Sequence, residues 1–142
     1  DSFEGLPPGQ AADGPVPFAA GDLQASRETL AANFRRHGLR PPEIHAGWFQ
    51  DTLPTRLPDR ICFAHLDGDY YDSIMVSLAH VYPRLSPGAV CLIDDYHDPS
   101  FGPGWNLLPG VKKACDEFLA DKPERVSMLY AAEYSHGYFR KQ

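Results

Sequence analysis

Two short apolar runs in the chain are each followed at once by acidic residues. The runs are RICFAHL and AVCLI, and continuous apolar runs of this length favour strands of a sheet that is covered on both faces. Asp67 and Asp69 follow the first run, and Asp94 and Asp95 follow the second. Carboxylates that gather at one place repel one another and raise each other's pKa unless a cation is present. These four residues are therefore the first candidates for chemistry.

The residues between the two runs predict that the acids meet in space. Ile74, Leu78 and Val81 recur at i, i+4 and i+7, which indicates one amphipathic helix, and Pro83 ends it. A strand, helix, strand unit crosses over right-handed and brings the carboxyl ends of both strands to one edge of the sheet, where ligands bind. Oxygen ligands without Cys or paired His predict Mg²⁺, Ca²⁺ or Mn²⁺ rather than zinc or copper.

Single acids at strand ends also have a simpler explanation. Asp is common in turns after strands and in helix caps, but two acidic motifs at the ends of consecutive strands favour a cation site. His97 lies just beyond the second acidic pair. It is either a base or ligand of that site or an exposed loop histidine, and the sequence leaves this choice open.

The remaining segments complete an open, doubly wound α/β sheet with loops at the carboxyl ends of its strands. A full apolar stripe from Val111 to Leu119 predicts a helix that covers the sheet. The other expected elements are a Pro- and Gly-rich loop at 4–21, a helix at 22–37 with Leu23, Leu30 and Phe34 on one face, a strand at 43–49, and a C-terminal antiparallel hairpin from 126–130 and 134–139.

The composition limits the class of protein. With 142 residues, 43% apolar and 23% charged, residues 1–142 have the size and composition of one globular domain, and no run reaches the length of a membrane helix. The net charge of -6 argues against a nucleic-acid partner and favours a small-molecule substrate. Cys62, Cys91 and Cys115 are expected to be reduced core residues. The chain begins at Asp1 without features of a secretory signal, so a cytoplasmic location and a missing upstream segment are expected.

Five motifs in a fixed order give the sequence its most specific feature. They are DSFEGLP at 1–7, GWFQDTLP at 47–54, HLDGDYYD at 65–72, LSPG at 85–88 and IDDY at 93–96. In these motifs and their spacing the chain resembles the macrocin O-methyltransferase family, whose members methylate sugar hydroxyls on natural products. The resemblance spans nearly the whole chain, because residues 111–118 resemble the family's following helix and residues 137–141 its last strand.

The resemblance implies a class I methyltransferase fold, with a Rossmann-like, mostly parallel sheet, an antiparallel C-terminal hairpin and, here, no first strand. It implies S-adenosylmethionine and Mg²⁺ as cofactors and a homo-oligomeric assembly. Asp1, with Ser2, corresponds to the position that binds the ribose hydroxyls of the cofactor. Asp51, with Trp48 and Phe49, corresponds to the adenine side, although aromatic residues packed in the core are the alternative for the last two.

On the metal side, the resemblance implies that Asp67, Asp94 and Asp95 ligate Mg²⁺ and that Asp69 is the general base, with His97 as a second catalytic candidate. The expected mechanism is that the cation chelates two vicinal hydroxyls of the sugar and lowers the pKa of the reacting one. Asp69 then takes the proton. The loops at 4–21 and 97–109 are expected to enclose the sugar.

Two other enzyme classes and one non-catalytic role remain as alternatives. Asp67-Gly-Asp69 is also an Asp-x-Asp pattern that can hold the metal of a nucleotide sugar, which would make the protein a metal-dependent glycosyltransferase. An aspartate-nucleophile phosphatase also uses Asp-x-Asp, but it needs an intervening Lys motif that this sequence does not offer, and it ranks third. The last alternative is an inactive, truncated methyltransferase fragment with a structural role.

Overall fold

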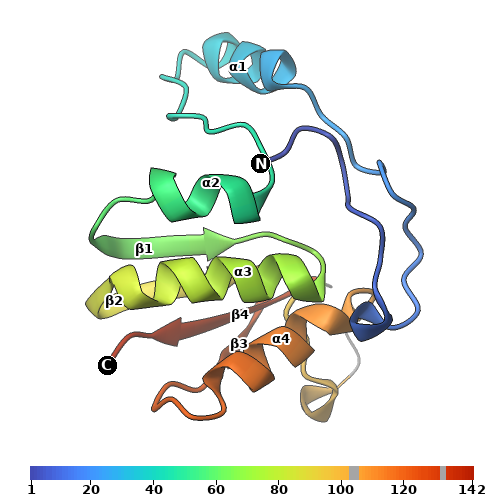
Figure 1. Cartoon of the computed structure of the whole chain (residues 1–142), viewed down its shortest axis with the longest axis vertical. Helices are drawn as coiled ribbons and strands as arrows, with labels where there is room; N and C mark the ends of the chain where they lie inside the picture. The colour runs from blue at the N-terminus through green and yellow to red at the C-terminus, as the bar shows by residue number, and fades with distance from the viewer. Residues whose placement is uncertain (103–105, 132–133) are drawn as a thin grey trace.

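The computed structural model describes residues 1–102, 106–131 and 134–142. Its α-helices and β-strands alternate through the middle of the chain and end in a hairpin (Figure 1). The helices are α1 (Arg27–Arg36), α2 (Phe49–Arg56), α3 (Tyr71–Val81) and α4 (Pro109–Leu119); the strands are β1 (Ile61–Leu66), β2 (Leu85–Ile93), β3 (Ser127–Ala131) and β4 (Tyr134–Arg140); and the short 3₁₀ turns are η1 (Ala11–Asp13), η2 (Tyr82–Arg84) and η3 (Pro99–Phe101).

The strands form one four-stranded sheet in the order β1-β2-β4-β3. β1 and β2 pair in parallel, with Leu66 opposite Ile93, whereas β2 with β4 and β4 with β3 pair antiparallel. The α/β class, the β1-α3-β2 unit and the C-terminal hairpin are therefore confirmed. The sheet is mixed rather than mostly parallel within the described residues, because the hairpin contributes two of its three ladders.

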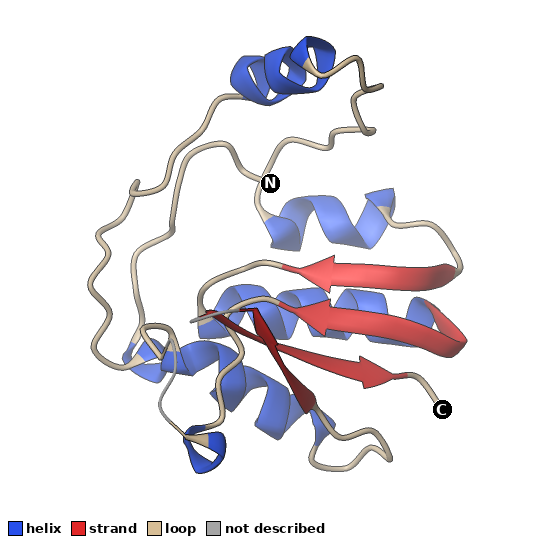
Figure 2. Cartoon of the chain, turned by 180° about the vertical axis from the view of Figure 1, so that it is seen from behind, coloured by secondary structure: helices blue, strands red, loops and turns tan. Residues whose placement is uncertain are grey.

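One face of the sheet carries the two long amphipathic helices. α3 and α4 pack against each other, and in the view from behind they lie beyond the strands (Figure 2). Both helices contribute fully buried side chains to one core cluster, among them Ile74 and Leu78 of α3 and Val111, Ala114 and Cys115 of α4. The predicted stripes of both helices are thus confirmed as the core.

The opposite face of the sheet has no covering helix among the described segments, and α2 lies beside β1 (Figure 2). The prediction of a doubly wound sheet covered on both faces is therefore wrong for this part of the chain. Phe63 of β1 is 58% exposed and Cys62 is exposed, so Cys62 is not a core residue. Cys91 and Cys115 are buried as expected, and burial raises the pKa of both thiols. An apolar run identifies a strand but does not show what covers it.

The first helix begins later than predicted. Ser26 caps α1 by accepting a hydrogen bond from the Thr29 N–H at 3.0 Å. Leu23 precedes this cap, with a left-handed φ of 61° and 66% exposure, so it does not share a helical face with Leu30. No residue of α1 is buried, and the helix stands away from the sheet (Figure 1).

The predicted strand at 43–49 is not formed. A strand needs a neighbouring strand to satisfy its backbone groups, and none of the described strands runs beside this segment. The Gly47 N–H instead donates to the carbonyl of Asp1 at 3.0 Å, Trp48 becomes the N-cap residue of α2, and Phe49 begins that helix. The aromatic pair therefore lies at a helix start rather than at a strand end.

The predicted long loop near the N-terminus is held at two places. At its base, the Leu6 N–H donates to the Asp22 carbonyl and the Gly21 N–H to the Leu6 carbonyl. At its far end the buried carboxylate of Asp13 accepts the Tyr71 N–H at the start of α3, at 2.6 Å. Gly110 permits this approach, because a Cβ there would lie 2.6 Å from Asp13 Oδ1. The loop is thereby fixed against α3 and α4.

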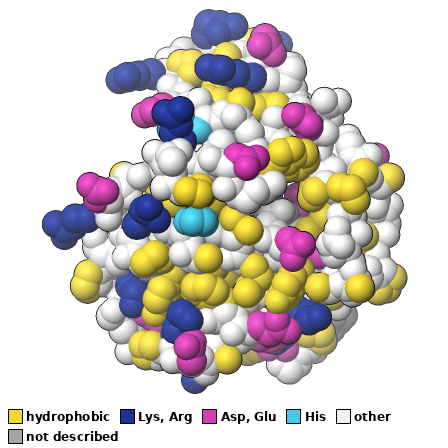
Figure 3. Space-filling model, in the orientation of Figure 1, with side chains coloured by type: hydrophobic (Ala, Val, Ile, Leu, Met, Phe, Trp, Pro, Cys, Tyr) yellow, Lys and Arg dark blue, Asp and Glu magenta, His cyan; other side chains and the backbone are white. Residues whose placement is uncertain are grey.

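The face shown in Figure 3 carries charged side chains of both signs. Of the helices described, none combines the length and the apolar character needed to cross a bilayer. On the face shown in Figure 3, Lys and Arg side chains are interspersed with Asp, Glu and apolar side chains. This mixed surface agrees with the net charge of -6.

Candidate active site

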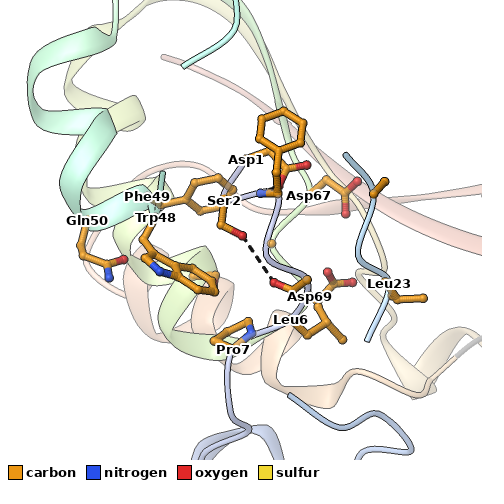
Figure 4. A pocket seen from close by; sticks show the side chains of 15 residues that line it. Asp1, Ser2, Leu6, Pro7, Leu23, Trp48, Phe49, Gln50, Asp67 and Asp69 are labelled. Atoms are coloured by element: carbon orange, nitrogen blue, oxygen red, sulfur yellow. Dashed lines mark hydrogen bonds between the residues drawn. The ribbon is translucent and has the colours of Figure 1, made fainter. Parts of the chain in front are cut away.

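A pocket of about 290 Å³ opens where β1 ends, near the lower size limit of small-molecule sites. Four segments form its walls: residues 1–7, residues 23–25 before α1, the start of α2, and the turn from β1 into α3 (Figure 4). The lining residues are Asp1, Ser2, Phe3, Gly5, Leu6, Pro7, Leu23, Ala25, Trp48, Phe49, Gln50, Asp67, Gly68, Asp69 and Ser73. The pocket therefore joins apolar and acidic walls at the carboxyl edge of the sheet.

Four of the five residues predicted on the cofactor side line this pocket. Asp1 and Ser2 lie on one wall and Trp48 and Phe49 on another. The two aromatic residues are only partly buried, so the alternative that they are packed in the core is wrong. Asp51 is exposed on α2 and does not line the pocket. The neighbouring Gln50 does line it, and the sequence did not single out this residue because the start of α2 was predicted as a strand end.

Asp1 and Ser2 make hydrogen bonds within the turn that begins the chain. Asp1 Oδ1 accepts the Phe3 N–H at 2.7 Å, and the Ser2 hydroxyl donates to the Gly5 carbonyl at 3.5 Å, as the dashed line in Figure 4 shows. Phe3 has a left-handed φ of 62°. These contacts fix the wall of the pocket at Asp1 and Ser2.

Three carboxylates meet at one end of the pocket. Asp67, Asp69 and Asp95 each offer an oxygen, and these oxygens lie within 4.8 Å of one another. The parallel pairing of β1 and β2 aligns the two strand ends, and the Asp94 N–H donates to the Leu66 carbonyl at 2.8 Å. The predicted meeting of the two acidic motifs is thus confirmed in the geometry.

The backbone itself is bent at two of these acids. Asp69 and Asp95 have positive φ values of 59° and 54°, the left-handed region that Asp and Asn occupy more readily than most residues. Each of the two turns therefore directs a carboxylate into the cluster at a small conformational cost.

The cluster is electrostatically unfavourable by itself. Burial, followed by repulsion from Asp67, Asp95 and Asp94, raises the pKa of Asp69 to about 6. Burial and repulsion from Asp94 also raise the pKa of Asp67, although His65 and His136 oppose this. A divalent cation bound between the carboxylates would relieve both costs, so the donor set fits an oxygen-ligated ion.

Asp94 does not join the three clustered oxygens but faces two histidines. Its Oδ1 contacts His136 Nδ1 of β4, and its Oδ2 lies 3.9 Å from His65 Nε2 of β1. Neither histidine was predicted as a site residue from the sequence. His65 is visible in the motif that also holds Asp67, but His136 can be placed only with the register of the hairpin, in which Gly137 pairs with Ile93.

His97 is buried, at 4% exposure, so the alternative of an exposed loop histidine is wrong. Its Nδ1 lies 3.3 Å from the Ser135 hydroxyl. His97 is not a member of the carboxylate cluster. Its predicted role as base or ligand stays a prediction.

The chain is similar to known O-methyltransferases. It is 40% identical over 110 residues to mycinamicin III 3''-O-methyltransferase of Micromonospora griseorubida, covering 70% of the chain and 43% of that protein. It is 34% identical over 128 residues to demethyldecarbamoylnovobiocin O-methyltransferase of Streptomyces niveus, covering 84% of the chain and 45% of that protein. The chain thus spans less than half the length of these curated relatives.

The chain is also similar to two solved methyltransferase structures. The O-methyltransferase NovP matches with a TM-score of 0.79 and 30% identity over 100% of the chain and 58% of NovP. Calicheamicin methyltransferase CalS11 matches with a TM-score of 0.72 over 99% of the chain and 58% of CalS11, and its 20% identity shows the fold alone. The model of the macrocin O-methyltransferase family (TylF) matches residues 1–129. The chain therefore belongs to the macrocin O-methyltransferase family.

Proposed function

We propose that the protein transfers a methyl group from S-adenosylmethionine to a sugar hydroxyl of a natural product, with a divalent cation bound by the carboxylates at the carboxyl edge of the sheet. The observation that carries this proposal is that the pocket and the carboxylate cluster share Asp67 and Asp69. A methyl donor in the pocket and an acceptor at the cluster would therefore be neighbours, as direct transfer requires. The names of the curated relatives, which are sugar and natural-product O-methyltransferases, support the same chemistry.

The pocket offers separate surfaces for the parts of the donor. Trp48 and Phe49 supply apolar surface for the adenine ring, and Gln50 beside them supplies an amide that can both donate and accept hydrogen bonds. Asp1 and Ser2 face the place where the ribose hydroxyls would lie, and a carboxylate can accept both protons of a vicinal diol. The sulfonium end then lies toward Asp67 and Asp69.

The carboxylates at the carboxyl edge of the sheet would bind the cation and take the proton of the acceptor hydroxyl. We assign Asp67 and Asp95 as cation ligands, with Asp94 as the third carboxylate, and Asp69 as the group that takes the proton. A divalent cation supplies a positive charge that lowers the pKa of a bound hydroxyl. As the hydroxyl oxygen bonds to the methyl carbon, the carbon–sulfur bond breaks, its electron pair stays on sulfur, and the hydroxyl proton passes to the Asp69 carboxylate. Asp69 lies in the same cluster as Asp67 and Asp95, which keeps that transfer short.

Calorimetry of this chain with S-adenosylhomocysteine tests the donor half of the proposal. We expect binding by the parent chain and binding that is weaker by about tenfold for Trp48→Ala, because a stacked aromatic surface contributes about 1–3 kcal/mol per base. Asp59→Asn, an exposed position in the turn before β1, is the matched control and should bind as the parent does. Uridine diphosphate binding in place of S-adenosylhomocysteine would overturn the proposal in favour of the glycosyltransferase.

A titration with Mg²⁺ tests the cation half separately. The parent should bind and Asp95→Asn should not, since the variant removes one of the three clustered carboxylates. Equal Mg²⁺ binding by both proteins would remove Asp95 from the ligand set.

A further inference from the structure

Three consecutive residues of β4 contact the segment that follows β2. Ser135 meets His97 through its hydroxyl, and His136 meets Asp94 through Nδ1. Gly137 lies against the ring of the buried Tyr96, since a Cβ at Gly137 would be 2.7 Å from that ring. The C-terminal hairpin therefore contacts the segment that follows β2 at Asp94, Tyr96 and His97.

The register of the sheet explains this arrangement. β4 pairs antiparallel with β2, and Gly137 lies opposite Ile93, the last residue of β2. The residues of β4 that precede Gly137 consequently extend past the end of β2 and run beside the turn that begins at Asp94. The absence of a side chain at Gly137 lets Tyr96 pack on the strand, which brings the turn within reach of His136.

In the contact between His136 and Asp94, each side chain supplies the polar partner of the other. Asp94 Oδ1 and His136 Nδ1 are both buried, and in the described part of the chain neither has another hydrogen-bond partner. A buried carboxylate oxygen and a buried ring nitrogen are costly without a polar partner, so this contact fixes the orientation of the Asp94 carboxylate. With Oδ1 held by His136, Oδ2 is the oxygen that can turn to a cation.

The remaining charged neighbours act on the same carboxylate from the other side. His65 Nε2 lies 3.9 Å from Oδ2, and Asp67 repels Asp94 across the strand ends. His65 is 44% exposed in its side chain, against 28% for His136, so His136 is the more firmly placed of the two imidazoles.

We propose that His136 is a positioning residue, which holds Asp94 Oδ1 and so sets the orientation in which Asp94 serves the cation site. The inference rests on the cation half of the proposed function. Residues that hold metal-binding carboxylates and histidines from behind typically change metal affinity by about 10–100-fold when they are replaced. His136 lies outside the sequence motifs that resemble the family, in a strand far along the chain from the acids.

The test compares two polar replacements that differ only in where they place a nitrogen. The amide nitrogen of Asn can occupy nearly the place of Nδ1, whereas that of Gln reaches the place of Nε2. Mn²⁺ binding is measured by the electron paramagnetic resonance signal of the free ion, for the parent, His136→Asn and His136→Gln. His45→Gln is the matched control, because His45 makes a similar pair with Glu43 at 3.2 Å, outside the carboxylate cluster.

We expect His136→Gln to weaken Mn²⁺ binding by about tenfold or more, and His136→Asn to stay within about threefold of the parent. Melting temperatures recorded without metal separate a loss of fold from a loss of affinity, and the two variants should melt alike. If both variants bind as the parent does, or both lose binding equally, the positioning role is overturned while the cation site stands. A parent that binds no Mn²⁺ overturns the cation site itself, and the inference with it.

Discussion

Replacing Asp69 by Asn should stabilise the metal-free protein at neutral pH. The carboxyl of Asp69 has its pKa raised from 3.8 to about 6 by burial and by three neighbouring carboxylates, so the ionised group opposes folding. Asn has nearly the same shape without the charge. It also tolerates the left-handed backbone of this position, where φ is 59°. The replacement therefore removes the repulsion without adding backbone strain.

The size of this stabilisation follows from the raised pKa of Asp69 and depends on pH. A pKa about two units above that of the unfolded chain corresponds to about 3 kcal/mol of lost unfolding free energy once both states are ionised. Since the folded state binds the proton more tightly, this penalty is small at or below about pH 4, grows as pH rises through the window from 3.8 to about 6, and is complete above it.

Urea unfolding in the presence of EDTA measures the difference. We expect Asp69→Asn to exceed the parent by about 1–3 kcal/mol near pH 7.5 and by well under about 1 kcal/mol near pH 4. Asp59→Asn, on the exposed turn before β1, should show neither effect. A variant that gains nothing at neutral pH, or gains equally at both pH values, would refute the view that repulsion at the cluster opposes folding.

Two further changes test contacts away from the cluster. Asp13→Ala removes the buried acceptor of the Tyr71 N–H and should lower the unfolding free energy by about 1–3 kcal/mol in urea titrations, because it leaves a partly buried donor unpaired. Glu124 is buried, which raises its pKa, but hydrogen bonds from a backbone N–H, Tyr82 and Lys141 overcome this and lower the pKa to about 2. Its stabilisation is present above about pH 4.5 and is lost as pH falls toward about 2, so Glu124→Gln should lose about 3 kcal/mol at neutral pH and much less in acid. A loss that is the same at both pH values would contradict this account.

The predictable part of the site lies in the β1-α3-β2 unit. Both strands are read from uninterrupted apolar residues and the helix from its spacing, and the rule that consecutive strands of such a unit pair in parallel is enough to bring Asp67 and Asp95 together. All of this information is local in the sequence apart from one crossover, whose handedness is nearly fixed.

The part that could not be predicted depends on contacts between distant segments. Residues 43–49 have the composition of a strand, but strand formation needs a partner, and Trp48 instead stands at the N-cap position of α2. The orientation of each carboxylate depends on single backbone angles, such as the positive φ of Asp69 and Asp95, that apolar patterns do not encode. The contact of His136 with Asp94 requires the hairpin register, which is set by pairing rather than by either residue.

The N-terminal loop has a consequence for how its length can vary. Its two ends are joined by backbone hydrogen bonds between Leu6, Gly21 and Asp22, and Asp13 holds its far end against α3. Closing a loop depends only weakly on its length, since each doubling costs about 0.6 kcal/mol. The exposed residues at 14–15, between the anchor at Asp13 and the partly buried Val16 and Phe18, are thus the place where an insertion can enter while Leu6 and Pro7 keep their places in the pocket wall.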